Sequence, residues 1–163
     1  MSAHFAPETS SQASADQVEL ISFQIRDQYF CADLMAIREI RSWTPASPLP
    51  QAPDFIRGVV NLRGTVLPIV DLAARLGLGT TEPSARHAIL VAEIADQLVG
   101  LLVDGVSEIL SLPKGSLQAT PHVGCQVTRE FVRGLIPLDG RMLTLLSLDR
   151  IVPAIEMIEA QAA

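Results

Sequence analysis

Short runs of apolar and β-branched residues, separated by turn residues, alternate along most of the chain. Such runs predict β-strands, and the clearest occupy residues 20–25, 58–62, 65–70, 88–94, 98–103, 132–138 and 141–146. Helical patterns are few: residues 71–76 end at Gly77, which favours a helix C-cap, and residues 153–160 begin with proline. The pattern predicts a mainly β protein with short helices.

An internal repeat is the most informative feature. FIRGVVNLRGTVLPIVDL (55–72) aligns without gaps with FVRGLIPLDGRMLTLLSL (131–148), and seven of the eighteen positions are identical. Two upstream dipeptides of each copy also correspond: Asp27-Gln28 with Asp96-Gln97, and Glu39-Ile40 with Glu108-Ile109. Each copy has roughly 60 residues, enough for a five-stranded barrel whose core is marginal by itself. We therefore predict two small barrels that share a core and leave a groove along their pseudo-twofold seam.

The domain boundaries follow from this repeat and from composition. Residues 1–17, rich in serine and alanine, are expected to be a flexible tail. Residues 18–152 are the folded domain, with the first barrel at roughly 18–85 and the second at roughly 86–152. The repeat leaves open whether closing strands are exchanged between the barrels. Residues 153–163 are expected to form a short C-terminal helix or tail.

One turn of the first copy departs from turn chemistry. Asp139-Gly140 is a favoured dipeptide for a hairpin turn, and the equivalent pair in the first copy is Arg63-Gly64. Arginine suits a positive φ less well than aspartate. Arg63 is therefore a candidate site residue, although an exposed arginine that only solvates a turn is the alternative.

A second pair of matched segments lies upstream. IREI (37–40) and VSEI (106–109) each place apolar residues three positions apart with an acid between them. By default these apolar residues fill the barrel cores. If they lie at the seam instead, they line one groove from both sides, suited to a helix from another protein.

Composition excludes several classes of function. The chain has 163 residues, of which 48 % are apolar and 18 % are charged, and its net charge is −6. Negative charge argues against nucleic-acid binding, which depends on neutralising phosphates. No stretch is long and apolar enough to span a membrane, so direct insertion is not expected. Because residues 1–17 do not resemble a signal peptide, we expect a cytoplasmic protein. Because few residues are charged, we also expect some apolar surface to be available for partners.

The histidines and cysteines, which often act in catalysis, are not spaced in a pattern typical of an active site. His4, His87 and His122 have no partner at a metal-ligand or nucleophile spacing, and His122 with Cys125 supplies only two ligands. Cys31 and Cys125 form no motif and are expected to be free thiols. We predict a protein that is not an enzyme, with no catalytic residues, no metal and no cofactor.

The proline-rich segment TPASPLPQAP (44–53) allows two interpretations. It could be a polyproline ligand for an aromatic groove, or a stiff connector between two strands. Because it lies inside the repeat rather than in a tail, we favour the connector.

Taken together, FIRGVVNLRGTVLPIVDL, IREI, LVGLLVDGVSEIL and the later GRML closely resemble the CheW family of chemotaxis coupling proteins. The resemblance spans about residues 18–152. It implies two intertwined five-stranded barrels of the SH3-like type. It also implies a non-enzymatic adaptor that bridges the cytoplasmic tip of methyl-accepting chemoreceptors and the regulatory domain of the histidine kinase CheA, recruited from the cytoplasm to membrane-associated receptor arrays.

Carried over residue by residue, the resemblance implies a site. The residues that match the family's receptor-binding groove are Ile37, Gly58, Arg63, Val106 and Ile109. Glu39 and Arg63 match a family acid–base pair, and we expect these two side chains to approach each other. Glycine at position 58 indicates that a strand or a partner backbone passes close by.

Two other functions remain open from the sequence. A coupler of a non-flagellar pathway, controlling pili or a second messenger, has the same fold. A barrel that binds a small ligand is much less favoured, because aromatic residues make up only 4 % of the chain and supply few stacking platforms.

Overall fold

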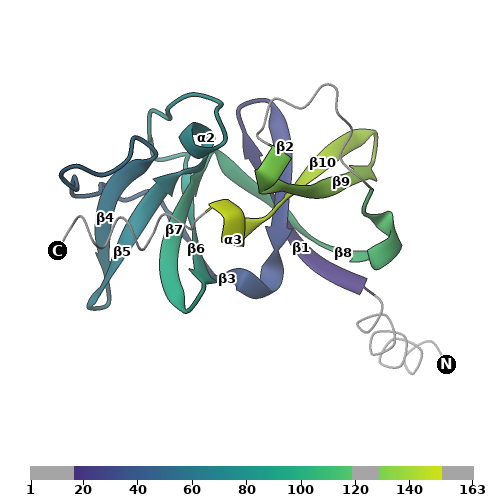
Figure 1. The fold of residues 1–163 in the computed structure, drawn as a ribbon, viewed down its shortest axis with the longest axis horizontal. Coiled ribbons are helices and arrows are strands. Elements are labelled where there is room, and N and C mark those ends of the chain that lie inside the picture. Colours follow the sequence, from purple (N-terminus) through teal and green to yellow (C-terminus); the bar gives the residue numbers. More distant parts are fainter. Residues whose placement is uncertain (1–16, 119–128, 152–163) are drawn as a thin grey trace.

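In the computed structural model of the chain, the described residues are 17–118 and 129–151. They form two five-stranded sheets that lie beside each other (Figure 1). The strands of the first half are β1 (Gln17–Ile25), β2 (Gln28–Asp33), β3 (Ile37–Ser42), β4 (Ile56–Leu62) and β5 (Thr65–Asp71). Those of the second half are β6 (Ala88–Ile94), β7 (Gln97–Val103), β8 (Gly105–Pro113), β9 (Val132–Leu138) and β10 (Arg141–Leu146).

Short helices join or follow these strands. The 3-10 helices are η2 (Leu34–Ala36), η3 (Lys114–Ser116) and η4 (Arg129–Phe131), and the α-helices are α2 (Leu72–Arg75) and α3 (Leu148–Ile151). Asp71 is the N-cap of α2, where its side chain accepts a hydrogen bond from the Ala74 N–H at 3.5 Å. Gly77 has φ +81° just beyond this helix. The mainly β fold with short helices is the one predicted from the pattern of apolar and turn residues.

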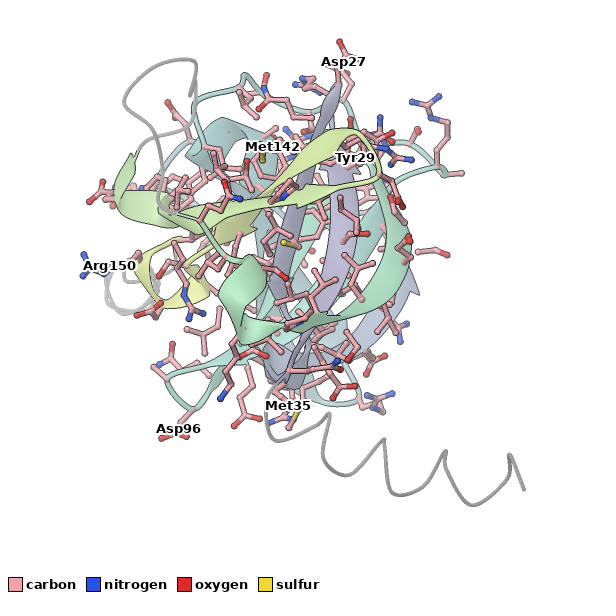
Figure 2. The ribbon with its side chains drawn as sticks, turned by 90° about the vertical axis from the view of Figure 1, so that its right-hand side faces the viewer. Asp27, Tyr29, Met35, Asp96, Met142 and Arg150 are labelled. Atoms are coloured by element: carbon pink, nitrogen blue, oxygen red, sulfur yellow. The ribbon has the colours of Figure 1, made fainter. Side chains whose placement is uncertain are left out.

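The two sheets have equivalent strand orders. Sheet A runs β8-β1-β2-β10-β9 and sheet B runs β3-β6-β7-β5-β4. Each sheet therefore combines the first hairpin of one repeat with the last three strands of the other. The repeat-equivalent hairpin turns at Asp27 and Asp96 lie at opposite ends of the molecule in Figure 2.

The ranges 18–85 and 86–152 are thus not the two sheets, because β1–β2 and β6–β7 are exchanged between the halves. Both copies have the same pattern of apolar and polar residues. The pattern alone therefore does not decide whether a hairpin pairs with the strands of its own copy or with those of the other. Packing of the whole chain decides between the two pairings.

A short bridge beyond the main strands closes each barrel. In sheet B, Ser47 and Val59 exchange two backbone hydrogen bonds of 2.9 and 2.8 Å. In sheet A, Gln118 and Leu135 do the same at 2.8 and 2.9 Å. The proline-rich segment that contains Ser47 therefore serves as a connector that returns the chain from β3 to β4.

Gly58 lies directly beneath the first of these bridges. A Cβ atom at this position would come within 2.2 Å of the Ser47 carbonyl oxygen, and the φ angle of Gly58 is +140°. At the equivalent Gly134, a Cβ atom would come within 2.7 Å of the Gln118 carbonyl oxygen. The backbone that passes close to Gly58 belongs to this chain itself.

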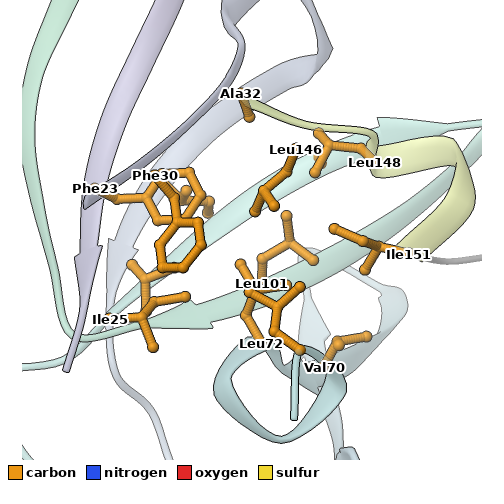
Figure 3. Close-up of a cluster of buried hydrophobic side chains, with 14 of the residues drawn as sticks. Phe23, Ile25, Phe30, Ala32, Val70, Leu72, Leu101, Leu146, Leu148 and Ile151 are labelled. Atoms are coloured by element: carbon orange, nitrogen blue, oxygen red, sulfur yellow. The ribbon is translucent and has the colours of Figure 1, made fainter. Parts of the chain in front are cut away.

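Three apolar clusters stabilise this arrangement. One fills each barrel: Leu20, Cys31 and Ile136 belong to the cluster of sheet A, and Leu67 and Ile89 to that of sheet B. The largest, here called the central cluster, lies between the sheets and takes residues from both (Figure 3). Its fully buried members include Phe23, Phe30, Val70, Leu72, Leu101 and Ile151. A core shared by both halves compensates for the small core of each barrel.

Several strands were predicted with their observed bounds, and three were missed. β6, β9 and β10 match the predicted residues 88–94, 132–138 and 141–146. β2, β3 and β8 were not predicted as strands. β3 and β8 each contain a β-bulge that interrupts the alternation of side chains, so neither shows a regular period of two. The predicted tail 1–17 lies outside the described residues except for Gln17, the first residue of β1, and so does all of 153–163.

We predict that Gly58→Ala destabilises the protein by roughly 2–4 kcal/mol, because the added methyl group meets the Ser47 backbone at a positive φ. Chemical denaturation measures this change. Gly115→Ala is the matched control, since a Cβ there has no atom within 4 Å, and it should change stability by less than about 0.5 kcal/mol. Equal effects of the two substitutions would contradict the closing role of this bridge.

We also predict that Cys31 does not react with thiol reagents in the folded protein. Its side chain is fully buried, and burial raises the pKa of the thiol to about 12. In a Cys125→Ser variant, a chromogenic disulfide reagent at neutral pH should detect no thiol until denaturant is added. Rapid labelling without denaturant would show that the sheet A core opens readily.

Candidate functional site

The edge strands β3 and β8 carry the matched segments IREI and VSEI, and each has a bulge at the same repeat position. In β3 the ladder skips Arg38, and in β8 it skips Ser107. A bulge moves the alternation of side chains by one residue, so residues three apart come to lie on one face of the strand. The apolar spacing that resembles part of a helical pattern is therefore produced by a bulged strand.

This face is the one turned toward the other sheet. In β3, Ile37 is paired with Ala92 and Ile40 with Leu90. In β8, Val106 is paired with Phe23 and Ile109 with Ile21. All four of these partners belong to the central cluster. Directly paired residues of neighbouring strands point to the same side of a sheet. Each edge strand therefore presents two apolar side chains toward the seam between the sheets.

The two members of each pair differ in exposure. Ile37 and Val106 are partly buried against the central cluster. Ile40 is 49 % exposed and Ile109 is 61 % exposed. We call these four residues, Ile37, Ile40, Val106 and Ile109, the apolar seam. Ile40 was not among the residues carried over from the family, but it belongs to the IREI segment whose apolar residues the sequence offered as possible seam residues.

Glu39 points to the opposite face of β3 and is held by two arginines. One carboxylate oxygen is paired with Arg63, and the other accepts a hydrogen bond from Arg41 Nη1 at 3.1 Å. The hydrogen bond from Arg63, followed by that from Arg41, lowers the pKa of Glu39 below its ordinary value. The expected approach of Glu39 and Arg63 is thus present, and Arg41 is a further partner that the sequence did not indicate.

Arg63 occupies a turn position that suits aspartate. Its φ is +50°, close to the +52° of Asp139 at the equivalent turn of the other barrel. The Arg63 side chain is 71 % exposed, so the ion pair limits its conformations but leaves the guanidinium accessible. In sheet A the equivalents of Glu39 and Arg63 are Glu108 and Asp139, two acids. The ion pair is therefore a feature of one barrel only.

A shallow hollow of about 480 Å³ surrounds this ion pair. Arg38 and Glu93, joined by an ion pair of 2.7 Å, form part of its wall with Glu39 and Arg63. Gly58 is not among the residues that line this hollow; it lies under the Ser47 bridge. The predicted residues thus fall into three places: the apolar seam, the charged hollow and the barrel closure.

Among residues 17–118 and 129–151, no group of three or more His, Cys, Asp or Glu side chains is placed to hold a metal ion. In the same part of the chain, no helix is long and apolar enough to cross a membrane. The two faces of β3 carry an exposed apolar side chain and fixed charges, features that are suited to binding another macromolecule.

Comparison with known proteins identifies the family of this chain. The sequence matches the CheW-like domain family over residues 19–156. This chain belongs to the CheW-like family. It is 51 % identical over 138 residues to the chemotaxis protein CheW of Rhizobium meliloti, covering 85 % of this chain and 89 % of that protein. It is 33 % identical to CheW of Thermotoga maritima, covering 88 % and 93 %.

A solved structure shows the same fold. The scaffolding protein TtCheW from Thermoanaerobacter tengcongensis superposes with a TM-score of 0.76 at 28 % sequence identity, over 82 % of this chain and 86 % of that one. The predicted family is therefore confirmed, and the chain is a member of the CheW family of chemotaxis scaffold proteins.

The ion pair predicts a specific effect of pH. In Arg63→Asn the pKa of Glu39 should rise toward its ordinary value. The variant loses the hydrogen bond from Arg63, which lowers this pKa most, and keeps the one from Arg41. A carboxyl with a lowered pKa stabilises the fold above its unfolded pKa, and this contribution disappears as pH falls through the folded pKa. The wild type should therefore lose slightly more stability than Arg63→Asn between about pH 6 and about pH 3.

NMR titration of the Glu39 carboxyl carbon and denaturation at the two pH values measure these effects. An unchanged Glu39 pKa in Arg63→Asn would show that the ion pair does not persist in solution.

Proposed function

We propose that this chain is a non-enzymatic adaptor that couples the cytoplasmic tip of chemoreceptors to the histidine kinase CheA. The observation that carries the proposal is the apolar seam, in which equivalent bulged strands present two apolar residues each from opposite sheets. Membership of the CheW family supports the chemotaxis setting. The protein acts in the cytoplasm and is recruited to membrane-associated receptor arrays.

The seam suits a helical partner for a physical reason. An amphipathic helix buries an apolar stripe in a groove and leaves polar residues at the rim. Ile40 and Ile109 are the large exposed apolar residues of the seam, while Ile37 and Val106 rest on the central cluster. Burying such side chains on binding contributes roughly 25 cal/mol per Å² of apolar area. The seam supplies the affinity for the receptor helix.

Arg63, paired with Glu39 on the face of β3 opposite the seam, supplies orientation. Its guanidinium is exposed, and the bond to Glu39 reduces the number of side-chain conformations that must be ordered on binding. A planar fork of donors recognises carboxylates and carbonyls in defined directions. Gly58 contributes indirectly, because its lack of a side chain lets Ser47 close the barrel that carries β3 and β4.

The first test is calorimetric titration of the full chain with two ligands: the regulatory domain of its cognate CheA, and a soluble coiled-coil fragment of a receptor cytoplasmic tip. We expect both to bind with micromolar dissociation constants or tighter. Ile109→Asp should abolish the heat with the receptor fragment, because it places a charge in the seam. Absence of binding to both ligands would refute the adaptor function.

A second test addresses Arg63. Arg63→Asp places at this turn the residue that Asp139 provides at the equivalent turn. Because Asp139 adopts nearly the same positive φ, we expect the backbone conformation to be retained. We expect receptor affinity to fall by about 5- to 20-fold, a loss of about 1–2 kcal/mol, with an unchanged far-UV spectrum. Arg86→Asp, at another exposed loop arginine, is the charge-matched control and should leave affinity unchanged. If Arg63→Asp unfolds the protein, Arg63 is structural and the assignment fails.

A further inference from the structure

Arg75 lies between two aromatic rings that the repeat makes equivalent. Its guanidinium carbon is 4.6 Å from the ring centroid of Phe55 and 4.6 Å from that of Phe131. These phenylalanines are the first residues of the two aligned segments, 55–72 and 131–148. One cation thus contacts both copies at the same distance, where the pseudo-twofold relation brings them together.

A third contact also joins Arg75 to the second copy of the repeat. Its Nε–H donates a hydrogen bond of 2.8 Å to the carbonyl oxygen of Ile151. Ile151 is the position equivalent to Arg75 in the second copy, since both lie three residues after the aligned segments. The two copies therefore differ at this position, and the arginine of one is bound by the backbone of the other.

Arg75 joins elements that belong to different sheets. It is the last residue of α2, which follows β5 of sheet B, whereas Phe131 precedes β9 and Ile151 follows β10 of sheet A. The central cluster also joins the sheets, but apolar burial has no preferred direction and tolerates small rotations. A hydrogen bond and two cation–π contacts fix direction as well as distance.

Stability alone does not explain a cation at this place. Burial lowers the pKa of Arg75, partly opposed by the negative charge of Glu130. In the part of the chain that the structure describes, none of the ion pairs includes Arg75. Arg75 is partly buried, and an apolar residue at such a position avoids the cost of removing a charge from water. The directional contacts are what an apolar side chain could not provide.

We propose that Arg75 is a positioning residue that sets the relative orientation of the two sheets and thereby the width of the apolar seam. Ile37 is on β3 of sheet B and Val106 is on β8 of sheet A, so their separation depends on that orientation. The consequence for receptor affinity rests on the proposed function, whereas the orientation itself does not.

The test combines a distance measurement with binding. Spin labels are attached at Ser42→Cys on β3 and Ser111→Cys on β8, both exposed, in a Cys125→Ser background where buried Cys31 stays unlabelled. Pulsed dipolar spectroscopy then gives the distribution of distances between the sheets. Receptor affinity is measured by calorimetry on the unlabelled protein.

The test variants are Arg75→Met, which keeps an unbranched side chain but removes the charge and the Nε–H donor, and Arg75→Lys, which keeps the charge. Arg141→Met is the matched control. Arg141 lies 4.5 Å from the ring centroid of Tyr29, but both residues belong to sheet A. This control therefore removes a similar cation–π contact that does not cross between the sheets.

We expect Arg75→Met to broaden or shift the distance distribution and to weaken receptor binding by about fivefold or more. Arg141→Met should leave the distribution unchanged, and Arg75→Lys should fall between the wild type and Arg75→Met. If Arg75→Met does not fold, Arg75→Gln, which also removes the charge, takes its place, and a wild-type distance distribution in that variant overturns the proposal. So does an Arg75→Met protein that melts earlier but keeps the wild-type distribution and affinity.

The failure of this inference can be told from failure of the proposed function. If the wild type does not bind the receptor fragment, the adaptor function fails, and the distance distributions of the variants alone decide the role of Arg75. If the wild type binds and the distributions are identical, only the role of Arg75 fails.

Discussion

The exchange of hairpins between the two repeats is the constraint on which the rest of this structure depends. β1–β2 completes the sheet of the second half, and β6–β7 completes the sheet of the first. The exchanged strands contribute Phe23, Phe30, Leu90 and Leu101 to the cluster between the sheets. Neither barrel retains its full set of strands without the other half, so the two fold as one unit and the seam between them has a defined shape. The proposed binding surface, made of two sheets, depends on this coupling.

The near-symmetry of the molecule makes the differences between its halves informative. Both copies keep the bulges in β3 and β8, the glycine under the closing bridge and the turn with positive φ. They differ where charge is placed: Arg63 against Asp139 at the turn, and Arg75 against Ile151 beside the paired phenylalanines. Features shared by both copies build the barrels. The differences give the molecule a polarity that a symmetric pair of barrels would lack, and an asymmetric partner requires such a polarity.

In the proposed adaptor function, the seam and the charged hollow make different contributions to recognition. Apolar side chains at Ile40 and Ile109 offer area whose burial is favourable but poorly oriented. The Glu39 ion pair offers direction and little net energy, because Arg63 is mostly exposed. An adaptor must bind, release and rebind partners, and neither element alone gives both modest affinity and a fixed orientation.

Local pattern was enough to predict the β class, the repeat, most strands and the turn at Arg63, because each depends on alternation or turn chemistry within one copy. The Glu39–Arg63 pair was predicted only through the resemblance to the CheW family. Local pattern was not enough for the sheet order, since both copies offer the same pairing edges and only the packed core distinguishes their exchange. β3 and β8 were missed because their bulges break the alternation by which strands are found. Arg41 was missed because the face on which its side chain lies follows from that bulge. The closing role of Gly58 and the contacts of Arg75 join segments far apart in the chain, so they exist only once the sheets have packed.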